Sequence, residues 1–248
     1  MGRYAIKICY DGTAYKGFQS QEGLDTIQSK LEEALSRKLN QPIEIVASGR
    51  TDAGVHALAQ VAHFDTDKEI DCESFGYSVN TLLPQDIAIT YCQKVDDDFH
   101  SRFDAISKTY RYKIVLSKIH SPLDRMYRHV CFYDIDVDKM RKASKYLIGE
   151  MDFRSFMLTD PTKLNTTRTI YDIRIEQEGN YLDIVVKGNG FLHNMVRNIA
   201  GTLIDVGRGR FAVSDMQSII DAKDRGRAGK TLEGKGLYLE SVEYKNFP

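Results

Sequence analysis

The stretch SGRTDAGVHALAQVAHF, residues 48–64, gathers side chains that could do chemistry. Gly49 and Gly54 flank Asp52, and glycine gives a loop the backbone freedom to project a carboxylate into a cleft. Arg50, two residues earlier, can keep that carboxylate ionised or reach a phosphate. In isolation, the same residues would make an ordinary Asx-turn with a surface ion pair. The stretch therefore indicates a site around Asp52 and leaves its chemistry open.

Several standard chemistries do not fit this stretch. His56 and His63 could join Asp52 as metal ligands, but their spacing matches no established metal motif, so we interpret them as structural or substrate-contacting residues. Ser48 lacks the G-x-S-x-G setting of a hydrolase nucleophile. The segment GNGFLH (188–193) lacks the third glycine of a dinucleotide fingerprint, and no P-loop is present, so we expect no cofactor. A carboxylate in this position favours covalent chemistry at a sugar or an electron-poor base.

Strands and helices alternate along the chain and must position this stretch. Alternating apolar residues indicate strands, and apolar residues at helical spacing indicate helices. Asp25 and Gln28 form a plausible capping box for the first helix. The predicted strands cover residues 3–10, 42–46, 59–64, 87–94, 109–116, 167–176, 181–187 and 237–244. The predicted helices cover residues 24–39, 69–82, 137–147, 191–206 and 213–222. Each half of the chain is therefore expected to be an α+β unit.

Length and composition are those of a globular protein. The chain has 248 residues, of which 42% are hydrophobic and 28% charged, enough for one large domain or two small ones. No apolar run approaches the ~20 residues that span a bilayer, and the first ten residues do not resemble a signal peptide. The four cysteines form no C-x-x-C pair, which suits buried thiols in a reducing cytosol. We therefore expect a cytoplasmic protein.

Charge is distributed unevenly between the halves. Residues 1–104 carry 10 Lys and Arg against 17 Asp and Glu, whereas the rest carry 24 against 18. The basic excess lies mainly in residues 108–129 and 197–230, and in the second of these ranges Gly207, Gly209, Gly226 and Gly229 allow close backbone approach. Such clusters favour binding to a polyanion even when net charge is near zero. Among these residues, we expect Arg225 and Arg227 to contact phosphate.

Motifs throughout the sequence resemble one family. The segment SGRTDAGVHA resembles the signature loop of the tRNA pseudouridine synthase A family, which usually has Ala where Ser48 stands. The family usually also has Trp where Phe18 stands and Ala-Pro near Leu232 and Glu233. Further similar segments, in the family's order, are YDGTAYKGFQSQ (10–21), NTLLPQDI (80–87), FHSRFDAISKTYRY (99–112), FLHNMVRNIAGTL (191–203) and GKGLYLESVEY (234–244).

The resemblance implies an isomerase that converts uridine to pseudouridine at positions 38–40 of the tRNA anticodon stem-loop. Asp52 would be the nucleophile and would attack either C1′ of the ribose or C6 of the uracil. Tyr110 would pack on the target base and is a candidate to help remove the C5 proton, and Arg197 would pair with Asp52. Arg50 would help draw the nucleotide out of the helix, at a cost of a few kcal/mol, and Leu237 would line the pocket.

The resemblance also implies the fold and the partners. The expected fold is α+β, with two halves that share a mainly antiparallel sheet and hold the active cleft between them. Residues 1–104 would carry the catalytic aspartate loop, and residues 105–248 would form the basic, RNA-binding half. The protein would act as a homodimer on the tRNA anticodon stem-loop, without cofactor or metal. Two alternatives remain open: a non-catalytic tRNA-binding protein on the same scaffold, and a metal-dependent nuclease that uses Asp52, His56 and His63.

Overall fold

The alternating run at the start of the sequence forms strand β1 (Gly2–Tyr10) in a computed structural model that describes residues 2–160, 162 and 164–248. The chain divides into two units. Unit 1 runs to Ile106 and resumes at Tyr238–Pro248, whereas unit 2 comprises Ser107–Leu237. The observed division differs from the boundary expected near residue 104, because the last eleven residues belong to unit 1. The reason is that strand β10 pairs with a strand of that unit.

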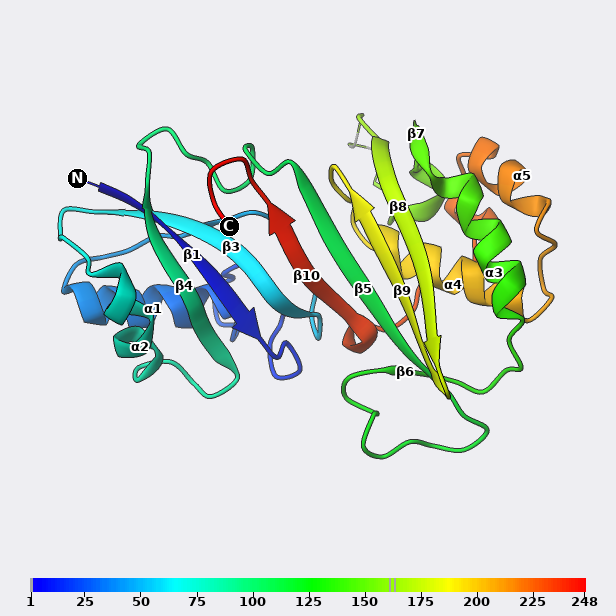
Figure 1. The fold of residues 1–248 in the computed structure, drawn as a ribbon, viewed down its shortest axis with the longest axis horizontal. Coiled ribbons are helices and arrows are strands. Elements are labelled where there is room, and N and C mark those ends of the chain that lie inside the picture. The colour runs from blue at the N-terminus through cyan, green and yellow to red at the C-terminus, as the bar shows by residue number, and fades with distance from the viewer. Residues whose placement is uncertain (1, 161, 163) are drawn as a thin grey trace. The chain divides into compact units, whose positions relative to one another are not determined.

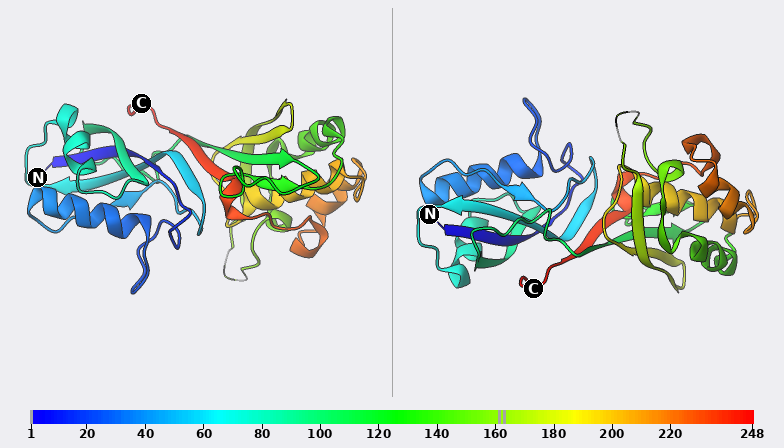
Figure 2. Two further views of the ribbon diagram at one scale, coloured as in Figure 1. Left: turned by 90° about the horizontal axis from the view of Figure 1, so that it is seen from below. Right: turned by 90° about the horizontal axis from the view of Figure 1, so that it is seen from above.

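Unit 1 is built on antiparallel strands. β1 pairs with β3 on one side and with β4 on the other, β2 pairs antiparallel with β3, and β10 runs parallel to β3. Helices α1 and α2 pack together, and α1 runs along the strands (Figures 1 and 2). The elements are β1 (Gly2–Tyr10), α1 (Ile27–Leu39), β2 (Val46–Ala47), β3 (His56–Thr66), α2 (Cys72–Asn80), β4 (Ile87–Val95) and β10 (Leu237–Glu243).

The start of α1 differs from the predicted capping box. Thr26, not Asp25, is the N-cap, and its hydroxyl accepts from the backbone N–H of Ser29, whose side chain accepts from the Thr26 N–H in return. The strand predicted over residues 42–46 is also mostly absent. The backbone N–H groups of Ile43 and Ile45 donate to side chains of α1 and so are not available to a strand ladder. The segment leading to β2 is therefore fastened to the helix.

Unit 2 also combines a mainly antiparallel sheet with helices. Its strands follow the order β5-β9-β8-β7, all antiparallel, and β6 runs parallel to β5. Helix α4, the most buried helix of the unit, packs against α3 and β5. The strands and α-helices are β5 (Ser107–Leu116), β6 (His129–Cys131), α3 (Val137–Ser144), β7 (Gly149–Asp152), β8 (Thr167–Glu178), β9 (Tyr181–Gly188), α4 (Met195–Gly207) and α5 (Asp215–Asp221). Single-turn helices are η1 (Lys145–Leu147), η2 (Arg154–Phe156), η3 (Arg225–Arg227) and η4 (Gly234–Gly236).

The expectation of an α+β fold with a mixed, mostly antiparallel sheet is confirmed. Antiparallel pairing dominates in both units, and the parallel pairs β3/β10 and β5/β6 make the sheet mixed. No helix in the described part of the chain is both long and apolar enough to cross a membrane.

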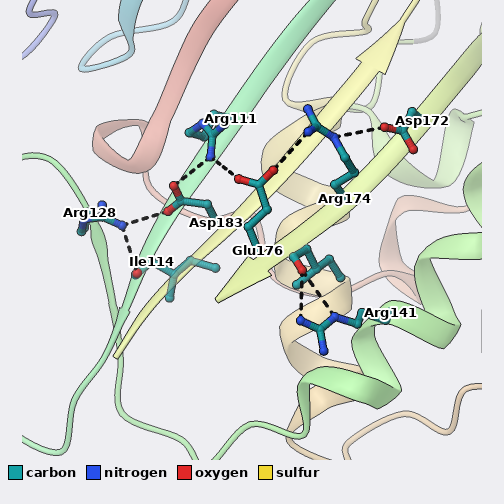
Figure 3. Close-up of polar contacts among 9 residues, drawn as sticks. Arg111, Ile114, Arg128, Arg141, Asp172, Arg174, Glu176 and Asp183 are labelled. Carbon is teal, nitrogen blue, oxygen red and sulfur yellow. Dashed lines mark hydrogen bonds and ion pairs between the residues drawn. The ribbon is translucent and has the colours of Figure 1, made fainter. Parts of the chain in front are cut away.

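Ion pairs tie the strands of unit 2 together on the sheet face away from α4 (Figure 3). Arg111 on β5 donates to Glu176 on β8 at 2.7 Å and to Asp183 on β9 at 3.1 Å. Arg128 donates to Asp183 at 2.9 Å and stacks over the ring of Tyr181. The Arg111 guanidinium holds the pKa of the Glu176 carboxyl below its usual range. Part of the basic excess of residues 108–129 is therefore neutralised within unit 2.

A buried imidazole lies in unit 1. His63 on β3 is 4% exposed, and its Nδ1 accepts the backbone N–H of Ser101 at 3.2 Å. Burial lowers the pKa of His63 to about 4. The neutral imidazole is therefore the native form, since a protonated Nδ1 could no longer accept that hydrogen bond.

This imidazole predicts a pH-dependent loss of stability. Because the folded pKa of about 4 lies below the unfolded value of 6.5, the unfolded chain binds the proton first. The free energy of unfolding should therefore fall as the pH drops from 6.5 to 4 and level off above 6.5. Urea unfolding at pH 7 and pH 5 measures this difference. His63→Gln, which does not titrate, should show a smaller difference between the two pH values; an equal difference would contradict the assignment.

Candidate functional site

Buried hydrogen bonds fix the loop that carries Asp52, residues 48–55 between β2 and β3. Ser48 is fully buried; its backbone N–H donates to Val61 at 2.7 Å and its hydroxyl donates to Gln60 Oε1 at 2.6 Å. Gln60 returns a hydrogen bond from Nε2 to the carbonyl of Gly49 at 2.9 Å. Thr51 Oγ1 lies 2.8 Å from the Tyr10 hydroxyl. The residues on either side of Arg50 are thus held by β1 and β3.

A glycine-containing turn, residues 11–18, packs against the other side of the loop. A Cβ on Gly12 would stand 2.0 Å from the carbonyl oxygen of Val55, and one on Gly17 would stand 2.9 Å from that of Thr51. Gly17 also has φ +99°, which other residues rarely adopt. The Phe18 N–H donates to the Thr51 carbonyl at 3.0 Å. Only glycine allows this close approach, which fixes Thr51 before Asp52 and Val55 after it.

The two charged side chains of the loop differ in exposure. Asp52 is partly buried, and its carbonyl accepts the N–H of Val55 at 3.2 Å in a turn that continues through Gly54, φ +73°. Arg50 is exposed and has no ion-pair partner within the described part of the chain. The loop therefore combines a positioned carboxylate with a cation that is accessible to a ligand.

The histidines of the loop segment take separate structural roles. His56 accepts the Gly12 N–H at Nδ1 and stacks on Tyr238 with the ring centroids 4.6 Å apart. His63 lies seven residues further along β3, which places its Cα about 23 Å away at the usual rise of a strand. The two imidazoles cannot share one ion, so the metal site of the nuclease alternative is not assembled. Among the residues that the structure describes, no group of three metal-ligating side chains comes together.

Arg197 is anchored at the first turn of α4 in unit 2. Its Nε donates to the Leu232 carbonyl at 2.7 Å, and its Nη1 donates to Asn194 Oδ1 at 2.5 Å. A cation at a helix N-terminus is disfavoured by the helix dipole, and the first turn contains no acidic residue. The two fixed acceptors offset this cost in part. An anion near this helix end would be stabilised by both the guanidinium and the dipole.

Tyr110 and Leu237 lie in the same unit as Arg197. Tyr110 on β5 is 8% exposed, and its ring meets Phe191 edge-on with the centroids 5.0 Å apart, just before α4. Leu237 is 7% exposed and follows Gly236, whose Cβ would stand 2.9 Å from the Tyr112 ring. Unit 2 thus brings the β5 tyrosines, the start of α4 and the segment before β10 together.

The site residues predicted from the sequence therefore fall into two groups. Arg50 and Asp52 share one loop of unit 1, whereas Tyr110, Arg197 and Leu237 belong to unit 2. The pairing of Asp52 with Arg197 and Tyr110 stays a prediction. Sequence reasoning missed the residues that hold these side chains, among them Gln60 and Asn194. The spacing of Asn194 three residues before Arg197, on one helical face, was the available signal.

Arg225 has a structural role that the sequence did not indicate. Its Nη2 donates to Asn198 Oδ1 at 2.9 Å and to Thr231 Oγ1 at 2.8 Å, and burial lowers the pKa of its guanidinium. Asn198 is fully buried on α4 and donates to the carbonyl of Phe156 at 2.7 Å. Arg225 therefore fastens the segment that presents the Leu232 carbonyl to Arg197, whereas Arg227 is exposed.

The departures from the family pattern have local explanations. Ser48 adds a hydroxyl that the usual Ala lacks, and this hydroxyl bonds Gln60. Phe18 is 2% exposed and packs near Tyr10, behind the Asp52 loop. The carboxylate of Glu233 pairs with Lys235 at 3.0 Å. In unit 1, Ser48 and Phe18 therefore keep the Asp52 loop fixed, whereas Glu233 changes the surface charge of unit 2.

Comparison with known proteins supports the family resemblance that the sequence motifs indicated. The model of a family described as tRNA pseudouridine synthase matches residues 6–104 and 143–245, which include the predicted site residues except Tyr110. The tRNA pseudouridine synthase A of Bacillus velezensis is 44% identical over 98% of this chain and 100% of its own length, and that of Bacillus subtilis gives the same values. The protein of that name from Pseudoalteromonas translucida is 42% identical over 98% of this chain and 92% of its own.

The different settings of Arg225 and Arg227 predict different effects of substitution. Arg225→Ala removes two donors from a partly buried network and should lower the free energy of unfolding by about 1–2 kcal/mol. Arg227→Ala should leave stability unchanged but reduce the salt dependence of RNA binding by about one phosphate contact. Urea unfolding and RNA binding at several salt concentrations measure both quantities. Equal stability of the two variants would refute the structural role of Arg225.

Proposed function

This chain belongs to the tRNA pseudouridine synthase family, and we propose that it isomerises uridine at positions 38–40 of the anticodon stem-loop with Asp52 as the nucleophile. The enzyme is an isomerase, so the reaction needs no external energy source. The observation that carries the proposal is the Asp52 loop, which is locked by buried hydrogen bonds on one side and by glycine contacts on the other. A nucleophile must be held in place in this way to gain from proximity.

The proposed reaction exchanges one bond of the uridine for another. Asp52 forms a covalent bond to C1′ of the ribose or to C6 of the uracil, and the bond between N1 and C1′ breaks. The held uracil rotates, a new bond joins C5 to C1′, and the bond from Asp52 to C1′ or C6 breaks, which regenerates the free carboxylate. The proton on C5 leaves to solvent and N1 gains a proton, so the product is an isomer of the substrate. Release of the C5 hydrogen is therefore a direct measure of turnover.

The chain's own residues support each requirement of this reaction. The carboxylate of Asp52 must remain ionised near an RNA polyanion, and the guanidinium of Arg197 is the proposed counter-ion. Its double anchoring to Leu232 and Asn194 limits its motion. Tyr110 is proposed to pack on the flipped base. Arg50, exposed beside Asp52, is proposed to help extract the nucleotide from the helix.

The charge of unit 2 suits the proposed RNA contact. Unit 2 carries 23 Lys and Arg against 16 Asp and Glu, whereas unit 1 carries 11 against 19. Ion pairs neutralise part of this excess, but Arg227 and Lys230 are exposed and have no ion-pair partner in the described part of unit 2. We propose that these side chains belong to the tRNA footprint, that Leu237 lines the pocket, and that the protein acts as a cytoplasmic homodimer.

Substitution of Asp52 tests the nucleophile. Asp52→Asn keeps the shape of the side chain but removes its nucleophilic charge, so release of tritium from 5-tritiated uridine in tRNA should fall on the order of 10³-fold or more. RNA binding should persist, because the cationic side chains are unchanged. Asp67→Asn, an exposed aspartate after β3, is the matched control and should turn over normally. Near-normal tritium release by Asp52→Asn would refute the nucleophile assignment, whereas no release by the unsubstituted protein would favour the non-catalytic alternative.

A second substitution tests the role of Arg197. Arg197→Lys keeps the positive charge but loses the planar fork that donates to two fixed acceptors. Turnover should fall on the order of 10²-fold with little change in RNA affinity, since the proposed partner of this side chain is Asp52. Arg154→Lys, at an exposed position of unit 2, serves as the control. A loss of RNA affinity that accounts for the whole effect would instead make Arg197 a phosphate contact.

A further inference from the structure

Phe103 of unit 1 is exposed in an unusual setting. Its side chain is 74% exposed. It lies in the turn formed by residues 100–104, between β4 and β5. Isolated exposed apolar residues are common and need no explanation. The surroundings of Phe103, however, form an ordered support for its ring.

Two imidazoles connect this ring to the interior of unit 1. The ring centroid of Phe103 lies 4.2 Å from that of His100, which lies 5.0 Å from that of the buried His63. Because burial lowers the pKa of His63 to about 4, the inner ring is neutral at physiological pH. The three rings therefore contact one another in series, edge-on and then tilted, from the buried His63 to the exposed Phe103.

Backbone hydrogen bonds hold the turn in one conformation. The N–H of Phe103 donates to the His100 carbonyl at 3.1 Å, and the N–H of His100 donates to Asp104 Oδ2 at 2.7 Å. The N–H of Arg102 donates to His100 Nδ1 at 3.1 Å. The exposed ring is thus presented by a rigid turn, and little conformational entropy is lost when a ligand binds it.

The turn is hydrogen-bonded to β2, the strand that precedes the Asp52 loop. Ser101, fully buried, donates from its hydroxyl to the carbonyl of Val46 on β2 at 2.5 Å. Val46 lies six residues before Asp52. Arg102, exposed beside Phe103, places its guanidinium 5.7 Å from the ring centroid. An aromatic face and a cation are therefore fixed next to each other on the structure that supports Asp52.

We propose that Phe103 is a stacking platform for an unpaired nucleobase of the tRNA substrate, with Arg102 beside it for the phosphate backbone. The proposal rests on the proposed function, because extraction of a uridine from the stem-loop leaves neighbouring bases that have lost a stacking partner. Single-stranded RNA is recognised by aromatic rings that stack on bases and by adjacent cations. The rigid ring with an adjacent arginine matches this chemistry.

Substitutions that separate stacking from apolar contact test the platform. In an Asp52→Asn background, which prevents turnover, binding of a synthetic anticodon stem-loop RNA is measured by fluorescence anisotropy. Phe103→Ala and Phe103→Leu should both weaken binding about tenfold, because neither offers an aromatic face. Phe103→Trp should bind at least as well as the parent. The salt dependence of binding should not change, since stacking releases no counterions.

Tyr77→Ala is the matched control, because Tyr77 on α2 is 80% exposed in the same unit and lacks such a support. It should bind RNA like the parent. Unchanged affinity of Phe103→Ala would overturn the platform. Retained affinity of Phe103→Leu would do the same, and if Phe103→Ala then shifted the oligomeric state, the ring would be a contact between copies of the chain.

Turnover of the otherwise unsubstituted enzyme separates this proposal from the proposed function. If that enzyme releases tritium while Phe103→Ala binds normally, the platform alone is wrong. If it releases no tritium while binding still depends on Phe103, the assigned reaction is wrong and the platform stands as an RNA-binding site.

Discussion

The buried hydrogen bonds that fix the backbone of residues 48–52 are the constraint on which the proposed site depends. A short catalytic carboxylate is useful only if its backbone is fixed to within a fraction of an ångström. Here the side chain of Gln60 ties Ser48 to Gly49, and the Tyr10 hydroxyl lies within hydrogen-bonding distance of Thr51. These groups are buried, so water does not compete with their hydrogen bonds. The loop is consequently part of the core of unit 1 up to Asp52, the proposed nucleophile.

In unit 2, hydrogen bonds fix the guanidinium of Arg197 in the same way. Arg197 is held by a carbonyl and an amide oxygen, and Arg225 fastens the segment that supplies the carbonyl. Many other basic side chains of this unit are engaged in ion pairs, such as Arg111 with Glu176. A positive net charge is therefore a poor guide to which residues contact RNA. Exposure and the lack of an internal partner are better guides.

Much of the fold follows from local sequence. Alternation located the long strands within a few residues, the glycines and charged residues of 48–64 located the Asp52 loop, and the resemblance suggested its chemistry. The predicted capping box was wrong because of a local alternative, since Thr26 rather than Asp25 bonds Ser29. Tertiary contacts decided the outcome elsewhere: the Glu32 side chain accepts the Ile45 N–H and shortens a strand. The role of Arg225 was missed for the same reason, since its buried acceptor on α4 lies 27 residues away in sequence. Motif residues are visible in a sequence, whereas their supports are not.

The central claim is that Asp52 forms a covalent bond with the substrate, and mass spectrometry tests it most directly. By either route, through C1′ or through C6, the RNA is bonded to the carboxylate during turnover, so rapid denaturation of the enzyme with its tRNA substrate should trap the adduct. After digestion of protein and RNA, the account predicts that the added nucleotide mass is located on Asp52. An adduct on any other side chain, or no adduct with a tRNA that is turned over, would contradict it.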